Sequence, residues 1–225
     1  MMSAAVDLVY VVARNGSNDE LRYSLRSVAA NLPHRHVVVA GYQPRWLTGV
    51  AHVPVAQDSD KWTNQARNVR AALAEVDDRF VLFNDDFFVV QPADEVPVMH
   101  GGSLAKTIKG LKRRSHPYAL RMIDTLEFLG GDALSFDRIH TPLPMRRDEA
   151  RRMFADIDGR YLFRSVYGNW FHDGGVETGD VKVRGRTVGV SGVFVSTSDR
   201  SWQRSEVGRR VRRLFPDPCV YEADR

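Results

Sequence analysis

Up to residue 90, short apolar runs alternate with stretches in which apolar residues recur at helical spacing. The apolar runs lie at 6–13, 36–42, 50–56 and 79–85, and they predict buried strands between turn signals. Pro54 suggests that the third of these strands lies at an edge of the sheet. Helical spacing occupies 17–32, where Ser17 and Glu20 have capping-box spacing, and 63–76. This alternation predicts a parallel sheet with helices packed on its faces.

Beyond that point the pattern becomes more helical. Helical spacing is found at 103–111, 118–129, 146–157 and 159–171. Short strands are expected around Gly185, within 181–190, and at 192–198, and an amphipathic helix is expected at 204–215. No repeat or flexible linker interrupts the sequence, so it predicts one α/β domain over 1–225 with a more helical C-terminal half.

The composition is that of an ordinary soluble globular protein, with 43% hydrophobic and 27% charged residues. A single cysteine, Cys219, excludes an internal disulfide and a cysteine-based zinc cluster, and it fits a reducing compartment. The N-terminal apolar run is short and has no basic region before it, so we interpret it as a strand and not as a signal peptide. No stretch approaches the ~20 apolar residues of a membrane span. We therefore expect a cytoplasmic protein.

The charge of the chain permits an acidic partner. The formal net charge is +4 and the sequence pI is about 9.4, which suits a nucleotide, an anionic glycan or DNA. The basic residues gather at 109–117 and 204–216. Two interpretations stay open. These segments are solvated helix faces, or the chain is a non-catalytic nucleic-acid-binding module whose affinity falls steeply with salt.

The familiar nucleotide-binding motifs do not follow the first strand. Residues 13–20 read ARNGSNDE, which lacks the G-x-G-x-x-G pattern, and the sequence contains neither a P-loop nor a serine-hydrolase elbow. A pair of carboxylates, Asp85 and Asp86, ends the fourth strand, where open α/β sheets bind their ligands. Adjacent carboxylates repel, so they need a cation, hydrogen-bond donors or a shared proton. The pair is either a solvated turn or a site for Mg²⁺ or Mn²⁺ bridging to substrate phosphates.

Two sets of helical residues are candidates for nucleotide binding. Arg22 and Arg26 lie one turn apart on the first helix, and guanidinium groups suit bidentate phosphate contacts. Lys61, Asn64 and Asn68 recur at spacings of three and four, so both asparagines share a helical face and are candidates for reading the nucleobase or ribose. The competing interpretation is a solvated helix face for the arginines, and an N-cap and an exposed amide for the second set.

The second half offers candidates for the reaction itself. His140 precedes the stiff segment TPLP, and a neutral imidazole there can accept the proton of an acceptor hydroxyl or ligate a metal. Arg164 and Asn169 are candidates for holding donor phosphates or sugar hydroxyls. His172 and Asp173 follow in a glycine-rich turn, where a structural role competes with a place on the acceptor side or at the metal. The tryptophans are candidates for sugar stacking, although core packing is their commoner use.

A series of short stretches along the chain carries a family resemblance. They are DLVYVV at 7–12, NDELRYSLRSV at 18–28, QPRWL at 43–47, LFNDDFF at 82–88, HTPLPM at 140–145, FRSVYGN at 163–169, FVSTSDRSW at 194–202 and LFPDPCVYE at 214–222. Together and in this order they resemble the Stealth family of sugar-phosphate transferases and related phage and actinobacterial glycosyltransferases. The resemblance implies a GT-A-like fold in which 1–92 binds a nucleotide-diphosphate sugar and 93–225 forms the acceptor side. It also implies transfer to a hydroxyl acceptor, which is a glycan, a protein or a DNA base.

The resemblance implies roles for individual residues as well. In NDD, Asn84 is expected to contact the donor, and Asp85 and Asp86 are the ligands of Mn²⁺ or Mg²⁺. We expect Asp86 to act in catalysis together with His140 and Arg164, which serve acceptor activation and the departing diphosphate respectively.

The loop after the first strand is the expected nucleoside site. Ala13, Arg14 and Asn18 follow the first strand and Gly41 ends the second, so all should lie beside the nucleoside. The first block of the phosphotransferases is longer than VARNGSND at 12–19. This difference favours plain glycosyl transfer, with sugar-1-phosphate transfer as the alternative.

Overall fold

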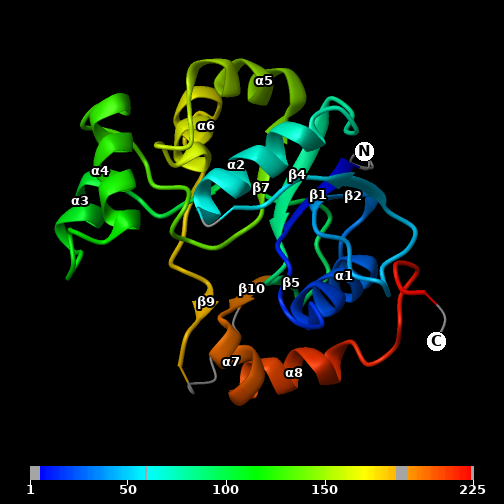
Figure 1. Cartoon of the computed structure of the whole chain (residues 1–225). Helices are drawn as coiled ribbons and strands as arrows, with labels where there is room; N and C mark the ends of the chain where they lie inside the picture. Colours follow the sequence, from blue (N-terminus) through cyan, green and yellow to red (C-terminus); the bar gives the residue numbers. More distant parts are fainter. Residues whose placement is uncertain (1–5, 59, 186–191, 224–225) are drawn as a thin grey trace.

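In a computed structural model, residues 6–58, 60–185 and 192–223 are described, and their centre is a five-stranded mixed sheet (Figure 1). The strand order is β3-β2-β1-β4-β7. These strands are β1 (Val6–Val12), β2 (His34–Gly41), β3 (Ala51–Pro54), β4 (Arg79–Asn84) and β7 (Leu143–Arg146). The first four strands along the sheet run parallel, and β7 is an antiparallel edge strand beside β4. The predicted parallel sheet is confirmed, with β3 and its Pro54 at the opposite edge.

Helices cover both faces of this sheet. α1 (Asp19–Asn31) packs on one face, against Leu8 and Tyr10 of β1. The other face carries α2 (Lys61–Ala72), α5 (Arg147–Asp156) and α6 (Phe163–Phe171). Val9 and Val11 of β1 point toward these three helices. Because both faces are buried, β1 has no solvated side, which explains why its sequence is a continuous apolar run.

A second, smaller sheet continues from the end of β4. Its strands, in the order β5-β10-β9, are Phe87–Val89, Phe194–Thr197 and Lys182–Val183. β10 is antiparallel to β5 and parallel to β9. Asp85 and Asp86 form the turn between β4 and β5, so the acidic pair lies where the two sheets meet.

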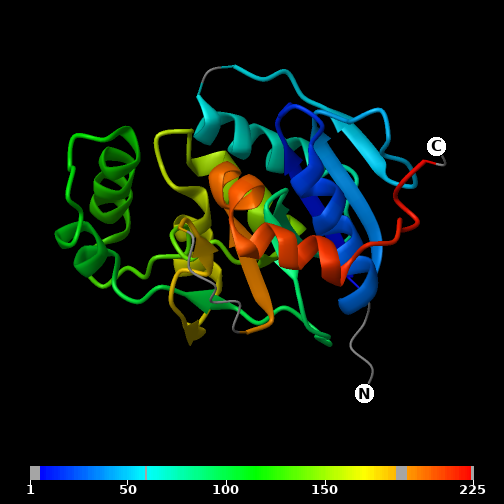
Figure 2. The same ribbon diagram turned by 90° about the horizontal axis from the view of Figure 1, so that it is seen from below.

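The remaining elements lie around these sheets. They are β6 (Met99–His100), α3 (Leu104–Lys109), α4 (Pro117–Leu129), β8 (Val176–Glu177), α7 (Asp199–Arg204) and α8 (Glu206–Leu214). Both views show α3 and α4 as a helical pair set beside the main sheet, with α7 and α8 near α1 (Figure 1, Figure 2). Trp202 of α7 stacks on Phe88 and contacts Tyr23 of α1. No helix in the described part of the chain has the length and apolarity needed to cross a membrane.

Two helix predictions were wrong in detail. The capping box of Ser17 and Glu20 does not form, because α1 begins at Asp19 and its N-cap, Asn18, adopts a left-handed conformation with φ 52°. Glu20 is buried instead and accepts a hydrogen bond from Thr197. The helix expected at 204–215 is broken at Ser205, whose backbone is extended between α7 and α8.

The strands expected within 181–190 fall only partly on described residues. Lys182–Val183 forms β9 as expected, and Ser205 donates a hydrogen bond of 2.8 Å to the Gly185 carbonyl. Residues 186–190 lie outside the described residues. The strand β7 was not predicted, because Pro144 and the short run around it indicated a stiff connection and not a ladder strand.

Candidate active site

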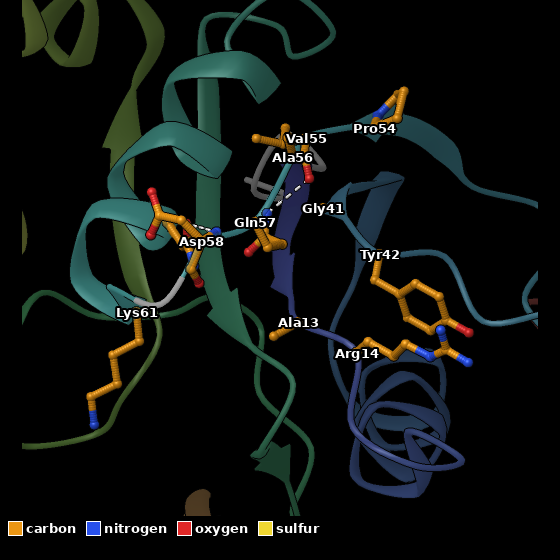
Figure 3. Close-up of a pocket in the computed structure, with 11 residues that line it drawn as sticks. Ala13, Arg14, Gly41, Tyr42, Pro54, Val55, Ala56, Gln57, Asp58 and Lys61 are labelled. Carbon is orange, nitrogen blue, oxygen red and sulfur yellow. Dashed lines mark hydrogen bonds between the residues drawn. The ribbon is translucent and has the colours of Figure 1, made fainter.

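Two adjoining cavities lie at the carboxyl ends of the parallel strands. The first, which we call the β2 pocket, has a volume of about 620 Å³ and is lined by Ala13, Arg14, Gly41, Tyr42 and residues of 54–64 (Figure 3). The second, which we call the β4 cavity, has a volume of about 780 Å³ and is lined by Asp85, His140, Arg164 and residues of α2 and α4. Ala13, Gln57, Lys61 and Asn64 line both. The two cavities therefore form one groove across the strand ends, where open α/β sheets bind ligands.

The β2 pocket depends on a close approach of β1 and β2. Gly41 ends β2 with φ 110°, and a Cβ there would lie 2.2 Å from the carbonyl oxygen of Val12. Only glycine allows this backbone geometry without strain. Arg14 extends beside Tyr42, with its guanidinium 5.6 Å from the ring centroid, and Ala13 lies on the chain directly before it (Figure 3). Three of the residues expected beside the nucleoside thus line one pocket.

The asparagines of α2 shape the wall shared by both cavities. Asn64 accepts a hydrogen bond from the Asp58 amide and donates one to the Asp58 carbonyl, at 3.0 and 2.8 Å. Asn68 accepts a hydrogen bond from Gln57 at 2.9 Å. Both side chains are buried and line the β4 cavity. They hold the 55–58 segment in place, and Lys61 at the start of α2 stays exposed at the groove.

The two aspartates of the turn after β4 have different surroundings. Asp85 lines the β4 cavity, and Asn84 beside it accepts a hydrogen bond from Gln65 at 3.2 Å. Asp86 accepts hydrogen bonds from Lys182 at 2.6 Å and from Ser196 at 3.2 Å. Both donors come from the second sheet, so two strands that follow 96 and 110 residues later in the chain hold Asp86 in place.

A third carboxyl group, that of Glu20, interacts with the acidic pair. Glu20 of α1 is 9% exposed and is held by the hydroxyl of Thr197. Burial and the negative charge of Asp86 raise the pKa of Glu20 to about 7. Burial, together with the charges of Asp86 and Glu20, also raises the pKa of Asp85 to about 8. Lys182 supplies one positive charge to three carboxyl groups, and a cation at Asp85 would relieve the repulsion.

The donor set fits Mg²⁺ or Mn²⁺. Within residues 6–58, 60–185 and 192–223, no three His, Cys, Asp or Glu side chains are already grouped around a metal position. A preformed cage is not required, since Mg²⁺ in phosphate-binding sites is commonly held by one or two carboxylates, substrate phosphates and waters. Asp85 supplies a hard oxygen ligand to the cavity, and a bound cation would favour the ionised form that burial and the neighbouring carboxyl groups disfavour. These residues therefore suit a divalent cation that arrives with a phosphate-bearing ligand.

His140 also lines the β4 cavity and has an uncommon backbone conformation. Its φ is 52°, a left-handed conformation that is uncommon outside glycine. Its Nδ1 lies 2.8 Å from a carboxylate oxygen of Asp180 and 3.0 Å from the Arg138 carbonyl. Both neighbours are acceptors, so Nδ1 carries the proton and donates. In the neutral ring, Nε2 is then free to accept a proton.

Asp180 is a functional candidate that the sequence did not suggest. Burial opposes its ionisation, but hydrogen bonds from His140 and Arg184 outweigh burial and lower the pKa of Asp180. Asp180 is therefore ionised at neutral pH and orients the imidazole of His140. Forty residues separate the two partners, and neither has a local motif that marks the pair.

Arg164 is a buried guanidinium with unused donors. Its side chain is 5% exposed and lines the β4 cavity, and one nitrogen donates to the Thr141 carbonyl. Its Nε and Nη1 are buried without a hydrogen-bond partner among the described residues. Burial lowers the pKa of Arg164, although a guanidinium remains charged. Unused buried donors of this kind indicate a site for an anion.

Several predicted site residues line neither cavity. Arg22 contacts Glu222 and the Trp46 ring, and Arg26 forms an ion pair with Glu222. Asn18 donates to the Ala13 carbonyl at the N-terminus of α1.

Other candidates of the second half have structural contacts. The Asn169 side chain bonds both backbone groups of Leu134. His172 hydrogen-bonds the Pro144 carbonyl at 3.0 Å, and Asp173 is exposed. Trp62 lines the β4 cavity, while Trp46, Trp170 and Trp202 line neither cavity.

No family model and no curated protein matches this chain. Solved structures do. A crystal structure of the galactosyltransferase LgtC in complex with donor and acceptor sugar analogs is similar to this chain, with a TM-score of 0.50 and 13% sequence identity over 95% of this chain and 96% of that one. A structure of an active-site mutant of LgtC matches with a TM-score of 0.51 and 13% identity over 92% and 94% of the two chains. The likeness confirms the predicted GT-A-like α/β fold.

Proposed function

We propose that this chain is a metal-dependent glycosyltransferase that moves a sugar from a nucleotide-diphosphate sugar to a hydroxyl acceptor. The observation that carries the proposal is the β4 cavity. In a GT-A-like fold, it combines a carboxylate for a divalent cation, an imidazole with a free nitrogen and a guanidinium with unused donors. The likeness to a galactosyltransferase structure supports the same class of activity.

The donor is proposed to lie along the groove. The nucleoside occupies the β2 pocket beside Arg14 and Tyr42, and the diphosphate extends into the β4 cavity. Asp85 would hold Mn²⁺ or Mg²⁺, which stabilises negative charge on the departing diphosphate when bound. Arg164 donates its unused hydrogen bonds to the phosphate oxygens. Asp86 keeps Lys182 in position beside them.

The acceptor is proposed to meet the donor sugar beside His140. The acceptor hydroxyl oxygen forms a bond to the anomeric carbon, and the bond from that carbon to the diphosphate oxygen breaks. The hydroxyl proton moves to Nε2 of His140, while the bonding electrons leave with the diphosphate. Asp180 keeps the Nδ1 proton in place throughout. The hydroxyl can belong to a glycan, a protein or a modified DNA base.

The test begins with thermal unfolding in a panel of nucleoside diphosphates and nucleotide sugars, with and without Mn²⁺. A true donor raises the melting temperature by mass action, and it does so only with the metal. The products of turnover then identify the reaction. Glycosyl transfer or donor hydrolysis releases a nucleoside diphosphate, whereas sugar-1-phosphate transfer of the Stealth type releases a nucleoside monophosphate. The proposal fails if no nucleotide stabilises the chain in the presence of Mn²⁺. It also fails if Asp85→Ala binds the nucleotide with Mn²⁺ as tightly as the original chain does.

A further inference from the structure

The mouth of the β4 cavity is bordered by a strongly basic loop. Residues 110–116 connect α3 to α4. Leu111 and His116 of this connection line the cavity, and so does Tyr118 of α4. Figure 1 and Figure 2 show the helical pair that carries the loop set beside the main sheet. Between the lining residues, the loop carries three exposed cations, Lys112, Arg113 and Arg114, which we call the basic loop.

The described residues do not neutralise the basic loop. None of the three side chains of the basic loop forms an ion pair in the described chain. Lys61 and Arg138, which are exposed and line the cavity, form none there either. The two other exposed or half-exposed cations of the cavity are already engaged, because Lys182 pairs with Asp86 and Arg184 pairs with Asp180. Exposed cations without an ion-pair partner among the described residues therefore extend from the cavity wall to the basic loop.

The proposed donor does not account for this charge. A nucleotide sugar brings a diphosphate with about two negative charges, and a divalent cation brings two positive charges, so the pair adds almost no net charge to the site. Arg164 already supplies unused donors for the diphosphate. Lys61, Arg138 and the basic loop remain available for a second anionic ligand, which a positive surface of this kind attracts from solution.

The aromatic residues of the cavity wall argue against a nucleic acid as that ligand. Single-stranded nucleic acids bind by stacking bases on open aromatic rings. Trp62 is not open, because its ring stacks on Tyr118 with centroids 6.2 Å apart and lies 4.7 Å from the cations of Lys61 and Arg121. The wall therefore offers charge and few open ring faces, which suits an anionic carbohydrate better than unpaired bases.

We propose that the acceptor is an anionic glycan, an oligosaccharide that carries carboxylate or phosphate groups. The basic loop and Arg138 bind its anionic groups at the cavity mouth, and this contact directs a neutral hydroxyl toward His140. The inference rests on the proposed function, since it assigns the acceptor side of that same reaction. It also gives the basic segment at 109–117 a role that does not require nucleic acid.

The test compares charged and uncharged probes that share one backbone. The first pair is a fluorescent galacturonic acid hexamer and its fully methyl-esterified form, and the second is maltohexaose with and without phosphate esters. Binding is measured by anisotropy for the original chain and for two variants. In the basic-loop variant, Lys112→Gln, Arg113→Gln and Arg114→Gln are combined. In the control variant, three exposed arginines of α7 and α8 that form no ion pair with another described residue are changed in the same way: Arg200→Gln, Arg204→Gln and Arg210→Gln.

The original chain should bind at least one charged hexamer roughly tenfold more tightly than its neutral counterpart, and the preferred pair tells carboxylate from phosphate. The basic-loop variant should lose roughly tenfold of that affinity, while the control variant changes it by less than about twofold. Equal loss in both variants, or no preference for charged hexamers, overturns the proposal. The proposal is also overturned if the original chain binds a single-stranded DNA hexamer more tightly than the charged sugar hexamers and the basic-loop variant loses this DNA binding. The basic-loop variant should bind a nucleoside diphosphate with Mn²⁺ as tightly as the original chain does. If the original chain itself does not bind a nucleoside diphosphate with Mn²⁺, the proposed function is refuted instead.

Discussion

At the turn after β4, one aspartate is held by its neighbours and the other is left facing the cavity. Asp86 has Lys182 and Ser196 as partners, while burial and the adjacent carboxylates penalise the charge of Asp85. The charge of Asp85 therefore lowers the stability of the metal-free protein, while the same charge would help to bind a cation.

Asp85→Asn should stabilise the metal-free protein and abolish metal-dependent transfer. The amide has the same shape but no charge, so it removes the repulsion with Asp86 and Glu20. The melting temperature at pH 8 without divalent ions should rise by a few degrees. Asp94→Asn is the matched control, because Asp94 is exposed. A destabilised Asp85→Asn protein with intact turnover would contradict the assignment.

The same residue predicts a pH dependence of stability. The pKa of Asp85 is raised to about 8 from an ordinary value of 3.8, so between these pH values the folded chain keeps a proton that the unfolded chain has lost. Stability then falls as the pH rises through this window, and the contribution of Asp85 is present in full only below it. Urea unfolding measured at pH 5 and pH 8 should show that the free energy of unfolding falls less between these pH values for Asp85→Asn than for the original chain.

His140 and Asp180 should differ in the size of their effects on turnover. His140→Ala removes the proposed proton acceptor and should slow transfer by roughly a hundredfold or more, with donor affinity mostly kept. Asp180→Asn leaves the imidazole but loses the ionised partner, so roughly a tenfold loss is expected. Asp180→Glu, which keeps the carboxylate, should retain more activity than Asp180→Asn. Calorimetry with the donor separates binding from turnover, and full activity of His140→Ala would remove it from the mechanism.

At the scale of elements, the position of the site depends on how closely β1 and β2 approach at their carboxyl ends. Gly41→Ala places a Cβ against the Val12 carbonyl and forces an alanine to adopt φ 110°. The free energy of unfolding should fall by about 3 kcal/mol, with weaker nucleoside binding. Gly16→Ala is the control, since Gly16 has φ 51° and open space around it and should cost about 1 kcal/mol. Equal effects of the two changes would show that the close approach is unimportant.

The elements that could be predicted are those whose signal is local. β1 and β4 have continuous apolar runs, and Asp85 follows directly from the end of one of them. The partners of the acidic pair could not be predicted in this way. Lys182 belongs to a two-residue strand, and its neighbour β10 pairs with β5 across more than a hundred residues. Nothing in the local sequence around Lys182 indicates such a pairing.

At the level of single residues, the sequence also leaves the role open where one residue type serves two purposes. An arginine pair one turn apart on α1 fits phosphate binding and fits a structural ion pair equally well in sequence. The structure has Arg26 in contact with Glu222, a residue near the other end of the chain. Asn169 likewise fits a sugar contact, but its amide holds the backbone of Leu134. Long-range partners decide such cases, and sequence spacing does not contain them.

For the whole molecule, the contact between α1 and the C-terminal segment closes the fold on the face opposite α2. Arg26 donates to both carboxylate oxygens of Glu222, at 2.6 and 2.8 Å, and to the carbonyls of Phe215 and Pro216. Both charged side chains are 8% exposed. The Cys219 amide also donates to Glu222, so one carboxylate holds the 215–222 segment against the helix. In Figure 2 the C-terminal segment follows α8 toward the edge of the main sheet.

Glu222→Gln should therefore destabilise the whole fold without changing catalysis. It leaves Arg26 buried and without its carboxylate, although two carbonyl bonds remain, so a loss of about 2–3 kcal/mol in the free energy of unfolding is expected. Glu206→Gln is the control, because Glu206 pairs with Arg209 and Arg213 at the surface of α8, where such pairs contribute less than about 1 kcal/mol. Urea unfolding measures both variants, and donor affinity is measured on the folded proteins.

Arg26 lines neither cavity, so donor affinity should be unchanged in Glu222→Gln and in Arg26→Met. A clear loss of donor binding in Arg26→Met, at a temperature where it is folded, would return this arginine to the donor site.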